Sequence, residues 1–174
     1  MDLHALFERQ MAMYVTYHRD ARNRMTHFIG IPPIVFSIVL MLGMLRFDIA
    51  GLELSAGIVT AAAVWVLWIL LDAALGIAMG VFLVPAVWLA ERLAVSDPGL
   101  AWAVAAACFV GGWAFQLLGH VFEGRRPALL SNLFQALIGP MFLVAEAFHA
   151  LGLKRDLHRR VEALADERER ASGT

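Results

Sequence analysis

Three histidines stand at the edges of long apolar segments, where polar side chains are costly. His18 and His27 lie near the start of the first apolar stretch, and His120 follows the fourth. Imidazole nitrogens are common ligands of iron and other divalent metals, and three of them leave coordination positions open for oxygen and a substrate. These histidines therefore define a candidate metal centre.

The end of the fourth apolar stretch places three polar side chains on one helix face. Gln116, His120 and Glu123 follow the spacing i, i+4, i+7. Ionisable groups at membrane depth usually line a cavity or a site. The alternative is an ordinary polar helix exit, in which Glu123 pairs with Arg125 or Arg126.

His18 and His27 need a bend between them to share a ligand. On an unbroken helix, residues nine positions apart face opposite sides. The run 19–24 can supply that bend. The alternative is that His18 is an interfacial residue and that His27 caps the first apolar helix.

A second pair of candidate ligands lies further along the chain. Glu146 and His149 have the Glu-x-x-His spacing that di-iron bundles use, although such bundles need two pairs. The pair keeps a di-iron lipid hydroxylase-like enzyme as an alternative. Glu146 can instead satisfy a backbone group or an arginine.

The elements that must position these residues are membrane helices. The 174 residues are 60% apolar and 17% charged, whereas soluble domains average roughly 45–50% and about 25%. The net charge of −1 offers no basic surface for nucleic acid. Crossing a bilayer takes about 20 apolar residues. The segments that qualify are 28–47, 54–71, 73–93 and 100–119.

Basic residues set the expected orientation. The N-terminal segment, the loop after the fourth stretch and the tail are rich in arginine, whereas the other two connections carry one arginine each. Because cytoplasmic loops carry the excess of Lys and Arg, four spans place all three basic regions in the cytoplasm and the three histidines at one membrane face. The apolar stretch 128–153, interrupted by Gly139-Pro140, is then expected to be a broken re-entrant or interfacial helix.

The predicted fold is an all-α, polytopic membrane helical bundle of about four transmembrane helices. An N-terminal amphipathic helix over 3–18 is expected along the membrane surface. We expect one membrane-embedded domain over 1–153 and a charged tail over 154–174. Asp72, between the second and third spans, is expected to cap a helix. With Gln116 it would otherwise suit a small transporter or structural membrane protein.

The residues around the histidines resemble the Mpo1-like family over roughly residues 5–150. The blocks that carry the resemblance are Tyr14-x-x-x-His18, Asn23-x-x-x-His27-x-x-Gly30-x-Pro32, Gly112-Trp113-x-x-Gln116-x-x-Gly119-His120-x-x-Glu123-x-x-x-Pro127-Ala128 and Asn132-Leu133-Phe134-x-x-Leu137-x-Gly139-Pro140. The resemblance implies an iron(II)-dependent dioxygenase that shortens 2-hydroxy fatty acids by one carbon in α-oxidation. It also implies that the iron ligands are His18, His27 and His120.

This resemblance suggests roles for the neighbouring residues. The expected partners are a 2-hydroxy fatty acid, O2 and the lipid bilayer. The arginine-rich and alanine-rich chain suggests a bacterial inner membrane, with both termini cytoplasmic. Arginines that could attract the substrate carboxylate are Arg22, Arg24, Arg125 and Arg126. Polar side chains that could act in catalysis, or orient a histidine or a bound water, are Tyr14, Asn23, Gln116 and Glu123.

Overall fold

The computed structural model describes residues 2–125, 132 and 134–173, and most of these residues are helical. The elements are α1 Leu3–Thr16, α2 Ala21–Gly43, β1 Arg46–Ile49, β2 Leu52–Ser55, α3 Ala56–Leu71, α4 Ala73–Ser96, α5 Pro98–Glu123, α6 Gln135–Ala150 and α7 Arg155–Ser172. The predicted all-α class is confirmed.

Three helices are long and apolar enough to cross a membrane. They are α2, α4 and α5, with 23, 24 and 26 residues. The second predicted span becomes α3, an apolar helix of 16 residues. At 1.5 Å per residue α3 is about 24 Å long, somewhat less than the hydrocarbon core of roughly 30 Å.

A β-hairpin forms the connection between α2 and α3. The predicted spans 28–47 and 54–71 both extend into this connection. Strands β1 and β2 pair antiparallel, with Ile49 opposite Leu52. The two turn residues, Ala50 and Gly51, both have positive φ angles of 55° and 84°. Two positive φ angles are the requirement of a type I′ turn, which matches the twist of the flanking strands.

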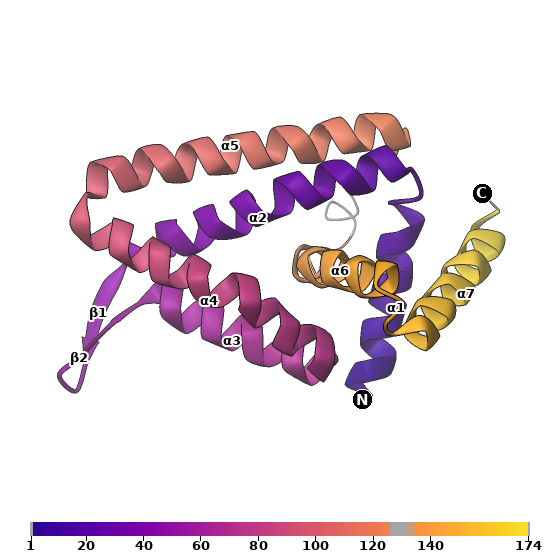
Figure 1. Cartoon of the computed structure of the whole chain (residues 1–174), viewed down its shortest axis with the longest axis horizontal. Helices are drawn as coiled ribbons and strands as arrows, with labels where there is room; N and C mark the ends of the chain where they lie inside the picture. The colour runs from indigo at the N-terminus through magenta and orange to yellow at the C-terminus, as the bar shows by residue number, and fades with distance from the viewer. Residues whose placement is uncertain (1, 126–131, 133, 174) are drawn as a thin grey trace.

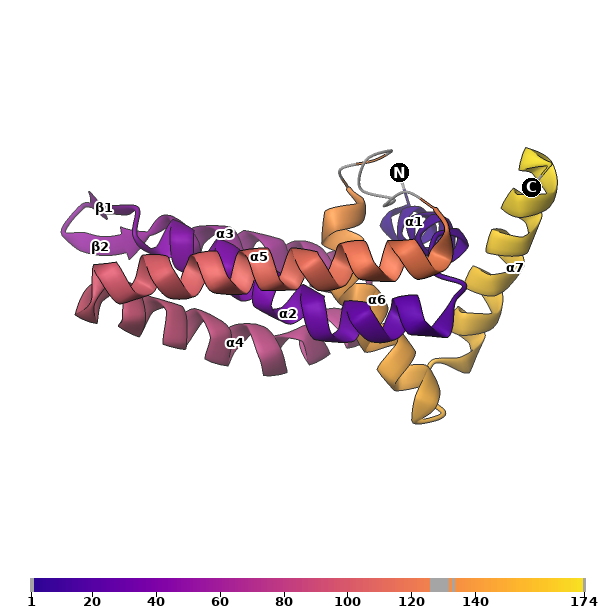
Figure 2. The ribbon, with the colours of Figure 1, turned by 90° about the horizontal axis from the view of Figure 1, so that it is seen from above.

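The helices form two antiparallel pairs that converge toward the α4–α5 turn (Figure 1). One pair is α2 with α5, and the other is α3 with α4. Helix α6 lies between the pairs at their open end, and α1 and α7 lie beyond it (Figures 1 and 2). This topology brings the start of α2 next to the end of α5.

Glycines let α2 and α5 approach closely. A Cβ atom built on Gly112 would lie 2.7 Å from the carbonyl oxygen of Gly30, and a Cβ atom on Gly30 would lie 2.7 Å from the carbonyl oxygen of Gly112. Small residues at helix crossings allow such backbone contact in membrane proteins. Any larger residue at either position would force the two helices apart.

Asp72 alone joins α3 to α4. Its carboxylate accepts a hydrogen bond from the Leu75 N–H at 3.1 Å, so the expected cap is confirmed. It also accepts two hydrogen bonds from Lys154 Nζ, at 2.6 and 2.8 Å. This ion pair fixes the α3–α4 corner to the start of α7.

The predicted N-terminal amphipathic helix is present as α1, but its apolar face is buried in the protein rather than laid on a membrane surface. Phe7 and Met11 are 0% and 2% exposed. The helices packed against α1 include α6 and α7. Helix α7 turns Leu157, Val161 and Ala165 inward and keeps most of its charges outward.

Helix α6 continues through Pro140, so the break expected at Gly139-Pro140 does not occur. Proline removes one backbone donor and can kink a helix, but neighbouring elements can hold it in place. Here the Trp68 indole of α3 donates a hydrogen bond to the Leu137 carbonyl at 2.9 Å. The first part of the predicted 128–153 stretch lies largely outside the described residues.

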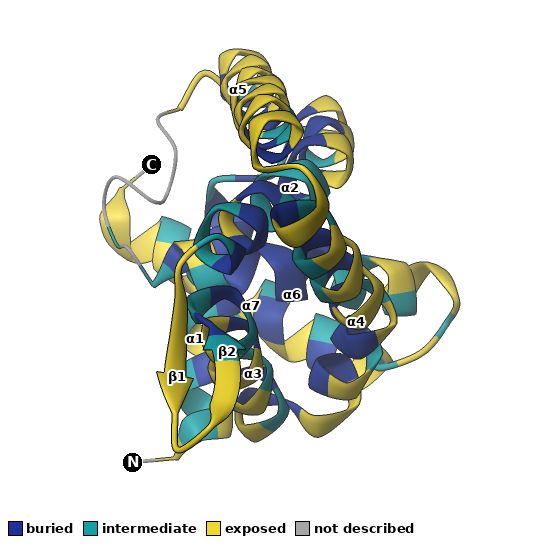
Figure 3. Cartoon of the chain, turned by 90° about the vertical axis from the view of Figure 1, so that its left-hand side faces the viewer, coloured by how far each residue is buried: buried dark blue, intermediate teal, exposed yellow. Residues whose placement is uncertain are grey.

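The outer surface of the long helices is apolar. Figure 3 shows buried residues on the inner faces and exposed residues on the outer faces of α4 and α5. Val81 of α4 and Val110 of α5 are 82% and 67% exposed. Contiguous exposed apolar surface of this kind suits contact with lipid. The predicted membrane helical bundle therefore agrees with both the length and the surface of these helices.

Candidate metal centre

The link between α1 and α2 forms the predicted bend. Helix α1 ends at Thr16, and α2 begins at Ala21 with Asp20 as its N-cap. His18 lies in this link and His27 lies in the second turn of α2. The bend turns the two imidazoles toward each other, so that their Nε2 atoms are 3.0 Å apart.

His120 completes the cluster from the last turn of α5. Its ring centroid lies 5.2 Å from that of His18 and 5.2 Å from that of His27. One nitrogen of each ring lies within 4.8 Å of the others, and all three residues are buried. The structure thus brings together all three histidines that the sequence analysis selects, because the antiparallel pair α2–α5 places them at one end of the bundle.

Backbone hydrogen bonds determine which nitrogens face the centre of the cluster. His18 Nδ1 lies 2.7 Å from the Tyr14 carbonyl, and His27 Nδ1 lies 2.9 Å from the Asn23 carbonyl. A carbonyl oxygen can only accept, so each Nδ1 carries the proton. In the neutral rings both Nε2 atoms then present lone pairs to each other. Two facing lone pairs at 3.0 Å repel, and a cation between them would remove the repulsion.

The surroundings of His18 keep it neutral. Burial, together with repulsion from His27, lowers the pKa of His18 to about 2. Its ring stacks on Tyr14 with the centroids 3.9 Å apart and the planes 2° from parallel. Neutral imidazole is the form that binds metals, so this environment favours ligation at neutral pH.

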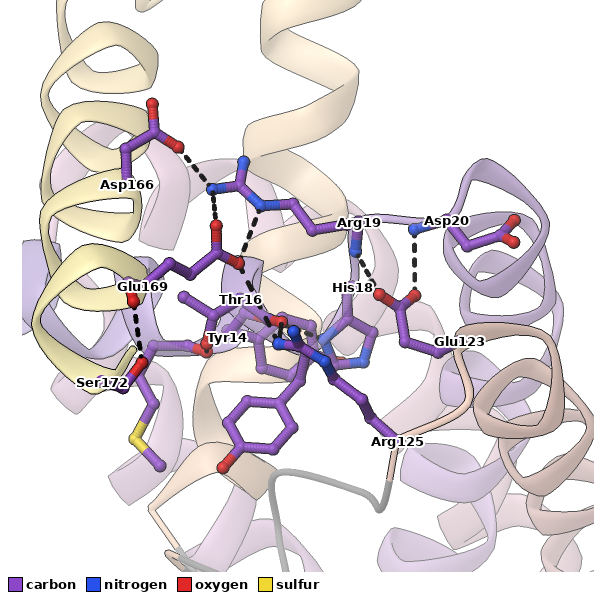
Figure 4. Close-up of polar contacts among 12 residues, drawn as sticks. Tyr14, Thr16, His18, Arg19, Asp20, Glu123, Arg125, Asp166, Glu169 and Ser172 are labelled. Carbon is purple, nitrogen blue, oxygen red and sulfur yellow. Dashed lines mark hydrogen bonds and ion pairs between the residues drawn. The ribbon is translucent and has the colours of Figure 1, made fainter. Parts of the chain in front are cut away.

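The Glu123 carboxylate binds the backbone of the α1–α2 link and not a histidine ring. Its carboxylate accepts hydrogen bonds from the backbone N–H groups of Arg19 and Asp20, both at 2.9 Å (Figure 4). It also accepts one from Asn23 Nδ2 at 3.0 Å. Within the described part of the chain, no hydrogen bond joins Glu123 to an imidazole. Glu123 and Asn23 are therefore positioning residues that lock the end of α5 to the start of α2.

An apolar cavity of about 170 Å³ opens beside the three imidazoles. Tyr14 and Gln116 line it, as the sequence analysis expects of residues at a site. Its other lining residues come from α2, α5 and α6 and are Ile31, Ile34, Val35, Ile38, Phe109, Trp113, Gln135, Ala136, Gly139 and Pro140. The cavity joins a small polar end to a long apolar wall, which suits an amphiphilic ligand.

The predicted carboxylate-binding arginines make other contacts. Arg22 pairs with Asp20 at 2.8 Å and lies over the Phe122 ring. Arg125 donates to the Thr16 carbonyl at 2.8 Å. Arg24 lies 3.7 Å from Glu146, and Arg126 lies outside the described residues. No arginine or lysine is among the described residues that line the cavity.

The second predicted pair of metal ligands, Glu146 and His149, lies apart from the three-histidine cluster. Glu146 faces Arg24, and the His149 ring stacks on His158 with the centroids 3.6 Å apart. Neither residue belongs to the three-histidine group found among the described residues. This geometry does not favour the di-iron alternative. Asp72, which the transporter alternative needs, is paired with Lys154.

An ionic contact next to the site cannot be seen in the sequence. Arg19, the residue after His18, binds three acidic side chains of α7: Glu162 at 2.5 Å, Asp166 at 2.7 Å and Glu169 at 3.3 Å. Figure 4 shows the contacts with Asp166 and Glu169. These partners lie more than 140 positions away, so no local pattern reveals them. The charged C-terminal helix therefore helps to hold the link that carries His18.

The fold and the site define a polytopic helical membrane protein with a buried three-histidine candidate metal centre at one end of its bundle. The sequence profile of the family described as 2-hydroxy-palmitic acid dioxygenase Mpo1-like matches residues 4–151. The chain therefore belongs to the Mpo1-like family, and the predicted family is confirmed.

The chain is also similar to a characterised relative. It is 34% identical over 157 residues to the 2-hydroxy-palmitic acid dioxygenase MPO1 of Saccharomyces cerevisiae, across 88% of this chain and 86% of the yeast protein. The family match over residues 4–151 includes the segments that carry all three histidines. No solved structure matches this chain.

Proposed function

We propose that this protein is a membrane-bound, iron(II)-dependent dioxygenase that shortens 2-hydroxy fatty acids by one carbon. The observation that carries the proposal is the buried cluster of three imidazoles, in which the Nε2 atoms of His18 and His27 face each other at 3.0 Å. Membership of the Mpo1-like family and the name of the yeast relative support the reaction and the substrate class.

The three histidines fit a divalent transition metal. Two nitrogens that share one ion at metal–nitrogen distances of about 2.1 Å lie no more than about 4.2 Å apart, and the Nε2 pair meets that limit. A ring nitrogen of His120, Nδ1, is buried and has no hydrogen-bond partner among the described residues. A donor set of imidazoles without thiolate suits iron and leaves positions for other ligands. Bound iron would supply Lewis acidity and redox chemistry toward O2.

The protein itself binds and orients the substrate. The apolar wall of the cavity would hold the acyl chain and exclude water, while the polar end would bring the hydroxyl and carboxylate beside the histidines. The overall reaction balances without an added reductant: a 2-hydroxy acid and O2 give the acid one carbon shorter, carbon dioxide and water.

We place the enzyme in a bacterial inner membrane with both termini cytoplasmic. The start of α2, with Arg22 and Arg24, and helix α7, with five arginines, lie at the same end of the bundle as the histidines (Figure 1). The excess of Arg and Lys at this end favours the cytoplasmic side.

The reaction is tested with purified protein in detergent, iron(II) and 2-hydroxyhexadecanoic acid. We expect oxygen consumption and the appearance of pentadecanoic acid by mass spectrometry, with hexadecanoic acid as the inactive control. Oxygen consumption without a shortened product, or no consumption by an iron-loaded preparation, would contradict the proposed function.

A further inference from the structure

We propose that two glutamines recognise the head group of the substrate: Gln135 accepts a hydrogen bond from the 2-hydroxyl, and Gln116 donates one to the carboxylate. This inference rests on the proposed function and assigns the residues that distinguish a 2-hydroxy acid from an ordinary fatty acid. Gln135 begins α6 and Gln116 lies on α5, so the two side chains reach the cavity from different helices.

Both glutamines are buried at the cavity wall with unused hydrogen-bonding atoms. Gln135 is 2% exposed and Gln116 is 7% exposed. Gln135 Oε1 and Gln116 Nε2 have no hydrogen-bond partner among the described residues, and both side chains line the same cavity as the three histidines. Buried polar atoms in native proteins are nearly always paired, so unpaired ones at a cavity wall indicate a ligand.

A chain of hydrogen bonds fixes the orientation of the Gln135 amide. The Phe134 N–H donates to Asn132 Oδ1 at 2.9 Å, so the other end of that amide, Nδ2, must be the donor to Gln10 Oε1 at 3.0 Å. Gln10 Oε1 therefore also accepts from Gln135 Nε2, at 2.6 Å. This sequence of donors and acceptors leaves Gln135 Oε1 as a free acceptor.

The free atoms match the chemistry of a 2-hydroxy acid. A carboxylate only accepts hydrogen bonds, and Gln116 Nε2 can donate one. The indole Nε1 of Trp113, which also lines the cavity and has no partner among the described residues, is a second donor. The 2-hydroxyl needs an acceptor for its proton, and Gln135 Oε1 is one. A fatty acid without the hydroxyl would leave this buried acceptor unpaired, which is the strongest basis for rejecting an analogue.

The test measures binding of two acids to the full-length, iron-loaded protein in detergent without oxygen, so that no turnover occurs. The variants are Gln135→Met, which keeps the approximate shape but removes the acceptor, and Gln116→Met as the matched comparison. We expect the wild type to bind 2-hydroxyhexadecanoic acid more tightly than hexadecanoic acid. Gln135→Met should reduce that preference about ten-fold, the equivalent of 1.4 kcal/mol, whereas Gln116→Met should weaken both acids about equally.

Two further results distinguish a wrong assignment of the glutamines from a wrong proposed function. Gln135→Glu, as the protonated acid, retains both an acceptor and the donor to Gln10 Oε1, so it should keep the preference for the hydroxy acid. If the wild type has the preference and Gln135→Met keeps it in full, the assignment of Gln135 is wrong and the proposed function stands. If the wild type shows no preference, the substrate class itself is wrong.

Discussion

At the scale of single residues, the site depends on the protonation of two imidazoles. The Tyr14 and Asn23 carbonyls each accept a hydrogen bond from a histidine Nδ1–H, which leaves the two Nε2 atoms free for a metal. Hydrogen bonds of this kind set the tautomer of metal-binding histidines. Burial and the proximity of His27 lower the pKa of His18, one of the three candidate ligands.

The metal-free protein should lose stability in acid. The pKa of His18 is about 2 in the folded protein and about 6.5 in an unfolded chain. Between these values the unfolded chain binds more protons, so the free energy of unfolding falls as the pH drops below about 6.5. From pH 6.5 to 5 the protonation of this one group in the unfolded chain lowers the free energy of unfolding by about 2 kcal/mol.

Thermal unfolding of the metal-free protein between pH 5 and 8 measures this effect. The comparison variant is His18→Phe, which keeps a ring against Tyr14 but cannot take up a proton. Its unfolding temperature should depend less on pH than that of the wild type. Equal pH dependence in the two proteins would show that His18 is not the group responsible.

Glu123 should contribute to stability through the link. Glu123→Gln removes the charge and turns an NH2 group toward donors that need an acceptor. Hydrogen bonds to charged groups are worth about 1.5–3 kcal/mol, so we expect a loss of about 2 kcal/mol in unfolding free energy and weaker metal binding. Glu167→Gln, on the exposed side of α7, is the control and should change neither quantity. If Glu123→Gln is as stable as the wild type, the segment between α1 and α2 keeps its conformation without this carboxylate.

At the scale of elements, hydropathy and histidine spacing predict the long helices and the three clustered imidazoles. Hydropathy predicts the helices because a lipid bilayer requires long apolar segments. An even number of spans places both ends of the chain on the same side of the membrane, and this brings the three histidines to one face. The need for a bend between His18 and His27 also follows from helix geometry. The β-hairpin is missed because Phe47 and Leu54 look like parts of apolar spans.

Other features cannot be predicted because they depend on contacts between distant segments. Gln135 is part of an apolar stretch in the sequence, and only the packing of α6 against α1 reveals its free oxygen. The continuity of α6 at Pro140 and the burial of α1 also depend on neighbouring helices. The partners of Arg19 on α7 are a further example.

The crossing of α2 and α5 should not tolerate a methyl group. Gly112→Ala would place Cβ 2.7 Å from the Gly30 carbonyl oxygen, and overpacking of this kind costs about 1–3 kcal/mol. The neighbouring Gly111→Ala is the matched control, since a Cβ there meets no described atom within 4 Å. Alanine at that position should be neutral or more stable by up to about 1 kcal/mol. Thermal unfolding in detergent distinguishes the two variants, and equal stability would contradict the close approach.

At the scale of the whole molecule, the bundle has an arginine-rich end that carries the site and an opposite end that carries the hairpin. Helices α1 and α7 and the histidine cluster lie at one end, and the β1–β2 hairpin lies at the other (Figure 1). The cavity extends from the cluster along α2 and α5 toward the middle of the bundle. In the proposed orientation, a substrate would keep its head group near the cytoplasmic face while its tail stays in an apolar environment.

This orientation can be tested by labelling single cysteines in intact cells. In a Cys108→Ala background, Ala50→Cys lies in the hairpin turn and Glu167→Cys lies in α7. A membrane-impermeant maleimide should label the first variant from outside the inner membrane and the second only after the membrane is broken. The opposite pattern would invert the proposed topology.

The most direct test of the central claim is the iron content of the purified protein and of histidine variants. The wild type should hold roughly one iron per chain, the number that one three-imidazole site can bind. His27→Ala and His120→Ala should lose it while remaining folded, and His149→Ala, outside the cluster, should retain it. Unchanged iron in His27→Ala and His120→Ala, or its loss in His149→Ala, would contradict a metal centre built from His18, His27 and His120.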